Sequence, residues 1–167
     1  MTQVNTLEIL KQAILLERRG HGFYKAVAEK AADPDVASFF DSMAAEEKKH
    51  MQVLGGQYKS YHETSRFASG AFDQGDLSQI SASVLDGETR KKIAAAGFEA
   101  ASIEAAIFME QKAVDLYSRQ AQAAVDPEEK KLYTWLAAWE RQHLNQLAEI
   151  NKSLIESIWN DNNFWPF

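Results

Sequence analysis

The sequence predicts an all-α protein folded as a four-helix bundle. Three observations predict it: apolar residues recur at helical spacing, the chain holds two copies of one helix–break–helix segment, and a long polar segment separates the copies. Leu7, Leu10 and Ile14 show the helical spacing in the first copy, and Leu132 and Leu136 show it in the second. No stretch of strand length alternates between polar and apolar residues. Both halves are therefore expected to be helical.

The repeat is visible in an ungapped comparison of the two halves. Residues 13–54 align with residues 106–147 at an offset of 93, and 13 of the 42 aligned residues are identical. Several identities are polar residues that helix propensity alone would not select, so a shared amphipathic pattern does not explain them. We interpret the repeat as an ancestral duplication. The identities in the first copy are Ala13, Ile14, Glu17, Tyr24, Ala28, Ala31, Asp33, Pro34, Ala44, Ala45, Glu47, His50 and Leu54.

Each copy is interrupted once by an Asp-Pro pair, at Asp33-Pro34 and at Asp126-Pro127. Asp is a favoured helix N-cap and Pro fits the first helical turn, so a new helix is expected to begin at each pair. The predicted helices span residues 4–31, 35–60, 97–124 and 128–157.

The remaining residues form a long connection and a tail. Residues 61–96 contain three glycines among scattered polar residues and are too long for a tight turn. We predict that they form a crossover between a hairpin of residues 4–60 and a hairpin of residues 97–157. Residues 1–167 are then one domain, with residues 158–167 as a C-terminal tail.

Composition excludes several classes of function. The chain has no cysteine, which excludes disulfides, iron–sulfur clusters and cysteine-bound zinc. A net charge of −6 argues against nucleic-acid binding, which needs a basic face. Charged residues interrupt the N-terminal segment before the apolar core of a signal peptide develops, and no composition typical of a membrane span is present. We expect a cytoplasmic protein that binds small molecules or ions, not nucleic acid or membrane.

Four glutamates are predicted to share one level of the bundle. Glu17 precedes the break at Asp33 by 16 residues, and Glu47 follows it by 14. At about 1.5 Å per residue, the two carboxylates differ in height by only about 3 Å. The second copy repeats this spacing with Glu110 and Glu140.

Each copy also contains a Glu-x-x-His motif, Glu47 to His50 and Glu140 to His143. A spacing of three residues sets both side chains on one helix face, where one metal ion could contact both. A single motif of this kind is weak, because it is usually a solvated helix face. Two motifs, each matched to a glutamate at equal spacing, favour a metal site.

Charge balance predicts the number of ions. Four buried carboxylates would repel one another, and two divalent cations supply four compensating charges. Carboxylate and imidazole ligands suit iron or manganese, although zinc or cobalt could occupy the same groups. We expect two iron ions as cofactors, with manganese or zinc as substitutes. The predicted ligands are Glu17, Glu47, His50, Glu110, Glu140 and His143.

These motifs resemble the ferritin-like di-iron superfamily, and within it the di-iron domain of the rubrerythrin family, over nearly the whole chain. The resemblance rests on Glu17 with Tyr24, Glu47-x-x-His50, Glu110 with Tyr117, and Glu140-x-x-His143. It implies an all-α, ferritin-like four-helix bundle, in which one long crossover joins two antiparallel helix hairpins.

The resemblance also implies a role for each site residue. Glu47 and Glu140 would bridge the two metals, and Glu17 and Glu110 would be terminal ligands. His50 and His143 would each bind one metal. The hydroxyls of Tyr24 and Tyr117 would hydrogen-bond to ligand carboxylates.

Two features depart from the rubrerythrin pattern. Rubrerythrins proper usually carry a C-terminal rubredoxin module with four cysteines, whereas this chain has none. Electrons are therefore expected from an external donor protein or a small reductant. Rubrerythrins also carry an additional glutamate three residues after the third-helix ligand, where this chain has Ala113. The metal movement associated with that glutamate is not implied here.

Several positions near the motifs keep two interpretations. Glu46, whose counterpart is Trp139, either orients His143 through its free ring nitrogen or faces solvent. His21 is expected to be a partly buried structural histidine, because its counterpart is Val114. His62 is expected at the surface of the crossover.

Two glycines of the first predicted helix and the C-terminal tail also have two interpretations each. Gly20 and Gly22 each cost about 1 kcal/mol inside a helix, which either close helix packing or an open path to the metals would explain. The aromatic tail favours a homodimer contact over packing on the bundle. The tail's large aromatic residues are Trp159, Phe164, Trp165 and Phe167.

The function that these features favour is a non-haem di-iron oxidoreductase. It would reduce a small oxidant, peroxide or dioxygen, with electrons from an external donor. One alternative is an iron-oxidising, iron-handling protein of ferritin type. Another is a metal-free helical interaction module.

Overall fold

Four long helices make up most of the structure, a computed structural model that describes residues 5–70 and 80–160. The helices are α1 (Thr6–Lys30), α2 (Pro34–Thr64), α5 (Gly97–Ala123) and α6 (Pro127–Asn160). No strand is present in these two ranges. The predicted all-α class and the ferritin-like four-helix bundle are confirmed.

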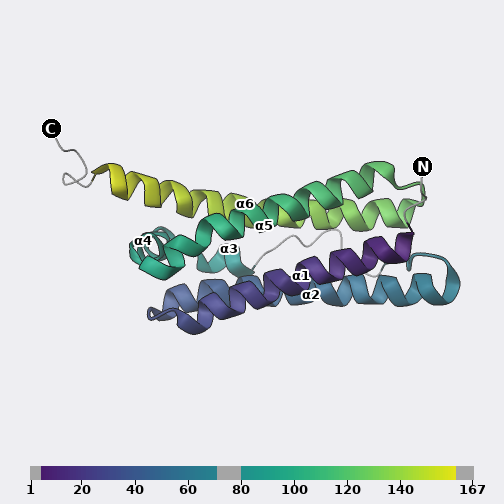
Figure 1. Cartoon of the computed structure of the whole chain (residues 1–167), viewed down its shortest axis with the longest axis horizontal. Coiled ribbons are helices and arrows are strands. Elements are labelled where there is room, and N and C mark those ends of the chain that lie inside the picture. The colour runs from purple at the N-terminus through teal and green to yellow at the C-terminus, as the bar shows by residue number, and fades with distance from the viewer. Residues whose placement is uncertain (1–4, 71–79, 161–167) are drawn as a thin grey trace.

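The helices form two hairpins, α1 with α2 and α5 with α6, which lie against each other along the bundle (Figure 1). Each hairpin turns at its Asp-Pro pair, as predicted. The Asp33 carboxylate accepts hydrogen bonds from the backbone N–H groups of Asp35 and Val36, at 2.9 and 3.3 Å. The Asp126 carboxylate accepts one from the N–H of Glu128, at 2.7 Å. These bonds satisfy N–H groups that a helix start leaves unpaired.

The second helix of each hairpin is longer than predicted. α2 continues to Thr64, so residues 61–64 are helical and do not belong to the crossover. It ends at Ser65, which has a left-handed backbone with φ of 56°. α6 likewise continues to Asn160, three residues beyond the predicted end.

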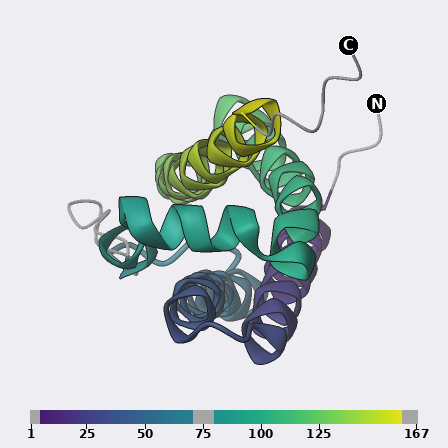
Figure 2. The ribbon, with the colours of Figure 1, turned by 90° about the vertical axis from the view of Figure 1, so that its left-hand side faces the viewer.

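The crossover contains two short helices that the sequence analysis did not predict, α3 (Ile80–Val84) and α4 (Gly87–Ala95). Asp86 caps α4, because its carboxylate accepts a hydrogen bond from the N–H of Thr89 at 2.7 Å. Figure 2 shows α4 running across one end of the bundle between the two hairpins. α3 packs against α2. The crossover is therefore part of the packed structure.

The apolar core has two parts, separated along the bundle. One part, around Leu10 and Leu54, contains the start of α1 and the end part of α2. The other, around Tyr24 and Phe39, contains the end of α1 and the start of α2. The level of Glu17, between Leu10 and Tyr24 on α1, therefore has packed apolar side chains on both sides of it.

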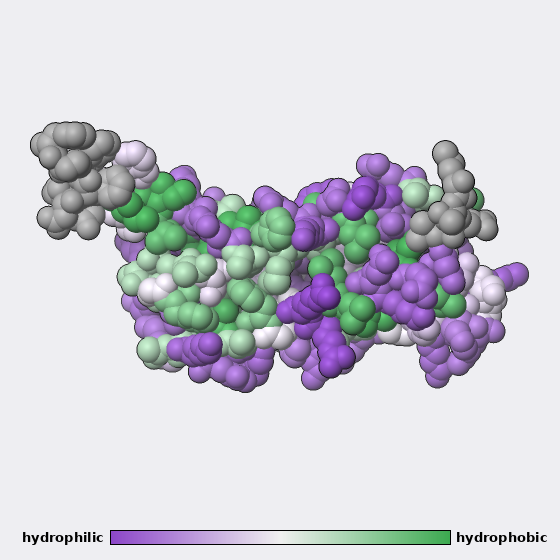
Figure 3. All heavy atoms as spheres, viewed as in Figure 1, coloured by the Kyte–Doolittle hydropathy of each residue, from purple (hydrophilic) through white to green (hydrophobic). Residues whose placement is uncertain are grey.

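The face where α1 and α5 lie next to each other is partly apolar (Figure 3). The large apolar side chains exposed on these two helices are Leu15, Phe98 and Phe108. Within the described ranges, no helix is both long enough and apolar enough to cross a bilayer. Of the aromatic tail, Trp159 is exposed at the end of α6, whereas Phe164, Trp165 and Phe167 lie outside the described residues.

Candidate metal centre

The six predicted ligands come together inside the bundle. α1 contributes Glu17, α5 contributes Glu110, and each of α2 and α6 contributes a glutamate and a histidine three residues apart. None of the six residues is more than 3% exposed. Buried carboxylates need hydrogen bonds, counter-charges or metal ions, so this cluster requires a compensating partner.

The six residues form two overlapping groups, and within each group the candidate ligand atoms all lie within 4.8 Å of one another. One group is Glu17, Glu47, His50 and Glu140, and the other is Glu47, Glu110, Glu140 and His143. Glu47 and Glu140 belong to both groups, which is the placement that a carboxylate needs to bridge two metals. The role of each residue as a ligand stays a prediction.

Both histidines turn the same ring nitrogen toward the carboxylates. Nδ1 of His50 lies 2.9 Å from Oε1 of Glu140 and 3.1 Å from Oε2 of Glu17. Nδ1 of His143 lies 3.1 Å from Oε1 of Glu47 and 3.2 Å from Oε2 of Glu140. Nδ1 is therefore the atom through which either imidazole could bind a metal.

Two carboxylate oxygens at the centre accept no hydrogen bond within the part of the chain that the structure describes. They are Oε1 of Glu47 and Oε1 of Glu140, and both are buried. An imidazole nitrogen lies 3.1 Å from the first and 2.9 Å from the second, but no hydrogen bond is formed. Buried acceptors are normally satisfied, so these two atoms fit a metal ion as the missing partner. The donor set of oxygen and imidazole nitrogen suits iron, manganese or zinc.

Burial raises the pKa of Glu17 and of Glu110 well above the usual 4.5, and the charges of Glu140 and Glu47 raise both further. Each of these two carboxyls therefore holds its proton to a higher pH than a free glutamate does while no metal is bound. A proton at each of them reduces the repulsion that four buried carboxylates would produce.

The other members of the cluster shift in the direction that forms ion pairs. Burial opposes the charged form of Glu47, but its close neighbours Glu17, His143 and His50 outweigh burial and lower its pKa well below 4.5. Burial also opposes the charged form of both imidazoles. For His50, the negative charge of Glu140 and the nearby carboxylates of Glu17 and Glu47 outweigh burial and raise the pKa well above 6.5. Protons therefore supply the positive charge that a metal would otherwise supply.

Two tyrosines connect the hairpins at the site. The hydroxyl of Tyr24 on α1 donates a hydrogen bond to Oε1 of Glu110 on α5. The hydroxyl of Tyr117 on α5 donates one to Oε1 of Glu17 on α1. Both tyrosines are fully buried. The duplication thus gives two equivalent bonds, and each crosses from one hairpin to the other.

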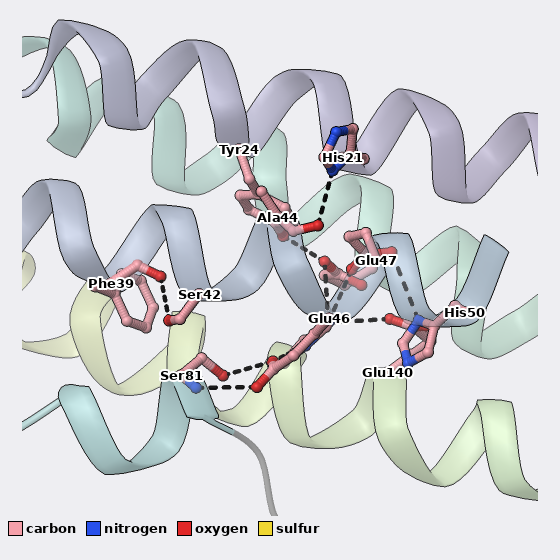
Figure 4. A network of polar contacts seen from close by, with 12 residues as sticks. His21, Tyr24, Phe39, Ser42, Ala44, Glu46, Glu47, His50, Ser81 and Glu140 are labelled. Atoms are coloured by element: carbon pink, nitrogen blue, oxygen red, sulfur yellow. Dashed lines mark hydrogen bonds and ion pairs between the residues drawn. The ribbon is translucent and has the colours of Figure 1, made fainter. Parts of the chain in front are cut away.

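Glu46 is buried and lies behind His143, so the interpretation that it faces solvent is wrong. Its Oε2 lies 2.8 Å from Nε2 of His143. It also accepts hydrogen bonds from the backbone N–H and the hydroxyl of Ser81 on α3, at 2.9 and 2.7 Å (Figure 4). Sequence reasoning missed Ser81, because a single serine in a polar crossover carries no signal.

The surroundings of His50 are different. The rings of Trp135 and Trp139 on α6 meet the imidazole edge to face, with centroids 5.6 and 5.2 Å away. Nε2 of His50 is buried and has no hydrogen-bond partner among the described residues. The two imidazoles thus have similar surroundings at Nδ1, which faces the carboxylates, and different surroundings at Nε2.

A small cavity of about 10 Å³ opens beside the carboxylates. This volume is about that of one water-sized probe. Its lining residues are Leu16, Glu17, Gly20, Glu47, Met109, Glu110, Ala113 and Glu140. Two of these residues, Gly20 and Ala113, are small and therefore help to leave a space next to the predicted metal positions.

Close packing, one of the two explanations that the sequence left open, accounts for Gly20. It lines the cavity, and a Cβ built at this position would lie 3.3 Å from the carboxyl carbon of Glu47. The glycine therefore permits close approach of α1 to a central carboxylate. Nothing lies within 4 Å of a Cβ built at Gly22, and nothing in the structure explains that glycine.

The two remaining histidines lie outside the cluster. Nδ1 of His21 donates a hydrogen bond to the backbone carbonyl of Ala44, at 2.8 Å, and the ring is half-buried, as expected of a structural histidine (Figure 4). His62 is exposed and stacks on Tyr58, with ring centroids 6.1 Å apart. It lies in the last turn of α2, not in the crossover.

Comparison with known proteins gives one family and one similar structure. A sequence model of the family described as Rubrerythrin matches residues 8–151, which include all six predicted ligands. A hypothetical protein from Pyrococcus furiosus is similar in structure, with a TM-score of 0.66, 24% sequence identity and coverage of 94% of both chains. At this identity, the similarity shows the fold alone. No curated protein matches this chain.

Proposed function

Because this chain belongs to the rubrerythrin family, we propose that it is a non-haem di-iron oxidoreductase that reduces peroxide or dioxygen with electrons from an external donor. The observation that carries the proposal is the pair of overlapping ligand groups, which share Glu47 and Glu140. A shared pair of carboxylates suits two ions held close together, as a two-electron reduction needs.

Two bound ferrous ions would supply one electron each. Their two electrons, with two protons, are what the reduction of one hydrogen peroxide molecule to two water molecules requires. The protein's own residues hold and orient the ligands. Tyr24 and Tyr117 restrain the carboxylates of Glu110 and Glu17 through hydrogen bonds. Such outer hydrogen bonds fix the direction in which a carboxylate presents its oxygens.

The cavity supports a small oxidant as the substrate. A cavity of about 10 Å³ leaves space beside the carboxylates for a molecule of roughly the size of water, which favours a small oxidant over a larger organic substrate. The apolar clusters on both sides of the site limit the entry of bulk water along the bundle. The electrons would come from a separate donor protein or a small reductant, because the chain has no cysteine for an iron–sulfur or rubredoxin-type centre.

Metal analysis and rapid kinetics test this proposal. Protein purified without chelator is analysed for metals, and apoprotein is loaded anaerobically with two equivalents of ferrous iron. Stopped-flow absorbance then follows its oxidation by equal concentrations of hydrogen peroxide and dioxygen, with added reductant to detect turnover. We expect faster oxidation by peroxide, followed by re-reduction and repeated cycles. Clearly faster oxidation by dioxygen would contradict the expectation that peroxide is the preferred oxidant.

The alternative of an iron-oxidising, iron-handling protein rests on Ala113. This position holds no additional carboxylate and lines the cavity, so the site contains six candidate ligands among the residues that the structure describes. A ferritin-type store needs a shell of many subunits, whereas the oxidoreductase is expected as a homodimer. Mass measurement of the iron-loaded protein by light scattering distinguishes the two. A large shell, or iron released as mineral after oxidation, would favour the alternative.

A further inference from the structure

The two hairpins present matching ligands, but the residues behind the two histidines do not match. At the offset of 93, His50 corresponds to His143, whereas Glu46 corresponds to Trp139. The two copies therefore share the ligands but differ at this position, where one has a carboxylate and the other an indole. The structure places each member of that unmatched pair against an imidazole, Glu46 against His143 and Trp139 against His50.

Behind His143, the carboxylate of Glu46 is held in a fixed position. It is only 3% exposed, and both of its oxygens are engaged by Ser81, through a backbone N–H and a hydroxyl. Oε2 lies 2.8 Å from Nε2 of His143. An imidazole that binds a metal through Nδ1 carries its proton on Nε2, so Glu46 is placed to accept that N–H. Such a partner fixes the tautomer and the ring orientation and makes the imidazole a better ligand.

Behind His50, no described group offers an acceptor. The neighbouring side chains are the indoles of Trp135 and Trp139, and an indole N–H is a donor only. Metal binding through Nδ1 of His50 would leave a buried N–H at Nε2, an atom with no hydrogen-bond partner among the described residues. A buried donor without an acceptor is unfavourable, so metal binding at this position lacks the support that His143 receives.

The charged side chains around the two histidines also favour a cation beside His143 over one beside His50. The buried carboxylate of Glu46 attracts a cation toward His143. On the other side, the ammonium of Lys49 lies 4.5 Å from the centre of the Trp139 ring, which packs on His50. Lys49 is exposed and screened by solvent, so its repulsion is the smaller of the two effects.

We propose that the two metal positions are unequal, and that Glu46, held by Ser81 of the crossover, makes the position served by His143 the tighter one. This inference rests on the metal site of the proposed function. It gives the crossover a role, because α3 contributes the residue that holds Glu46. The position served by His50 is then the one that loses its metal first.

Titration of the apoprotein with cobalt(II) alone tests the inference without any measurement of catalysis. Calorimetry gives the affinities, and visible absorption reports the cobalt environment. We expect two steps, with dissociation constants that differ by about 10- to 100-fold. Glu46→Gln keeps the size of the side chain and removes its charge, and should weaken the tighter step by about 10-fold or more and leave the weaker step unchanged. Glu99→Gln alters another buried glutamate, which lies in the first turn of α5, 11 residues before Glu110, and is the matched control.

Single-site backgrounds assign the effect to one histidine. In His50→Ala, the remaining position is the one served by His143, and Glu46→Gln should weaken it. In His143→Ala, Glu46→Gln should change nothing. Ser81→Ala, which keeps Glu46 and removes one of its donors, should weaken only the tighter step, by several-fold. Circular dichroism checks the helicity of each variant, and Ser81→Ala decides the question if Glu46→Gln does not fold.

The outcomes separate this inference from the proposed function. Two equal binding steps in the unaltered protein would overturn the inference and leave the metal site in place. An effect of Glu46→Gln that persists in His143→Ala, or an equal effect of Glu99→Gln, would also overturn it. Absence of any cobalt binding, together with purification free of metal, would overturn the proposed function itself.

Discussion

The hydroxyl of Tyr24 on α1 donates a hydrogen bond to the carboxylate of Glu110 on α5, so a side chain of one hairpin holds a predicted ligand of the other. Tyr24→Phe removes this bond and leaves a buried carboxylate oxygen without its donor. We expect a loss of about 1–3 kcal/mol in the free energy of unfolding of the apoprotein. Both metals should still bind, because the ligands themselves are unchanged.

Tyr133→Phe is the control for that substitution. Tyr133 is fully buried and stacks on Tyr117, but its hydroxyl has no hydrogen-bond partner among the described residues. Its removal should cost less than about 1 kcal/mol. Chemical denaturation of the two variants measures the difference, and equal losses would show that the Tyr24 bond contributes nothing of its own.

The overlap of the two ligand groups predicts the metal content of variants. Glu47→Ala and Glu140→Ala each remove a carboxylate that belongs to both groups, and should lose both ions. Glu17→Ala removes a member of one group only and should retain one ion. Elemental analysis after iron loading counts the ions. Retention of one ion by Glu47→Ala would show that this carboxylate does not bridge.

Two glycines of α1 provide a matched pair of substitutions. In Gly22→Ala, the added Cβ has no neighbouring atom within 4 Å. This substitution should stabilise the protein by about 1 kcal/mol through helix propensity alone. Gly20→Ala places a Cβ 3.3 Å from the Glu47 carboxyl, so it should gain less stability and weaken metal binding by about 10-fold. Thermal unfolding and metal titration measure both effects. Equal behaviour of the two variants would mean that Glu47 moves aside freely.

The pKa shifts predict how the stability of the apoprotein depends on pH. Folding raises the pKa of Glu17 and Glu110 above 4.5 and that of both imidazoles above 6.5, so the folded state binds more protons than the unfolded state above about pH 4.5. The stability that these groups contribute is complete below their unfolded pKa values and is lost as pH rises through the folded ones. We expect the free energy of unfolding of the apoprotein to fall from pH 5 toward pH 9.

Metal loading should reverse that trend, because a bound ion replaces the protons and binds more tightly as they leave. The stabilisation by metal, measured by urea denaturation with and without the ion, should therefore increase with pH. Glu47 shifts in the opposite direction, and its contribution is lost only as pH falls below 4.5, outside this window. An apoprotein that gains stability between pH 5 and pH 9 would contradict the assigned shifts.

The long helices could be predicted because their signals are local. The carboxylates of Asp33 and Asp126 cap the helices that follow, and the hairpin length then fixes the relative heights of Glu17 and Glu47. The short helix α4 carried a local signal as well, since Asp86 caps it, but the glycines around it favoured an irregular crossover. α2 ran past its predicted end because no proline or strong break precedes Ser65.

The surroundings of the site were harder to predict than its ligands. The spacing of Glu46 and His143 in the sequence says nothing of their contact, which depends on how the two hairpins meet. Ser81 reaches Glu46 only because α3 packs against α2. The crossed bonds of Tyr24 and Tyr117 likewise depend on the placement of one hairpin against the other.

Each ligand group takes three residues from one hairpin and a single shared carboxylate from the other, Glu140 in the first group and Glu47 in the second. Neither hairpin can complete a four-ligand site alone. A metal ion in either position would therefore cross-link the two hairpins. A single ancestral hairpin would have met the same condition by pairing with a second copy of itself, with the metals as the reason for the two copies to stay together.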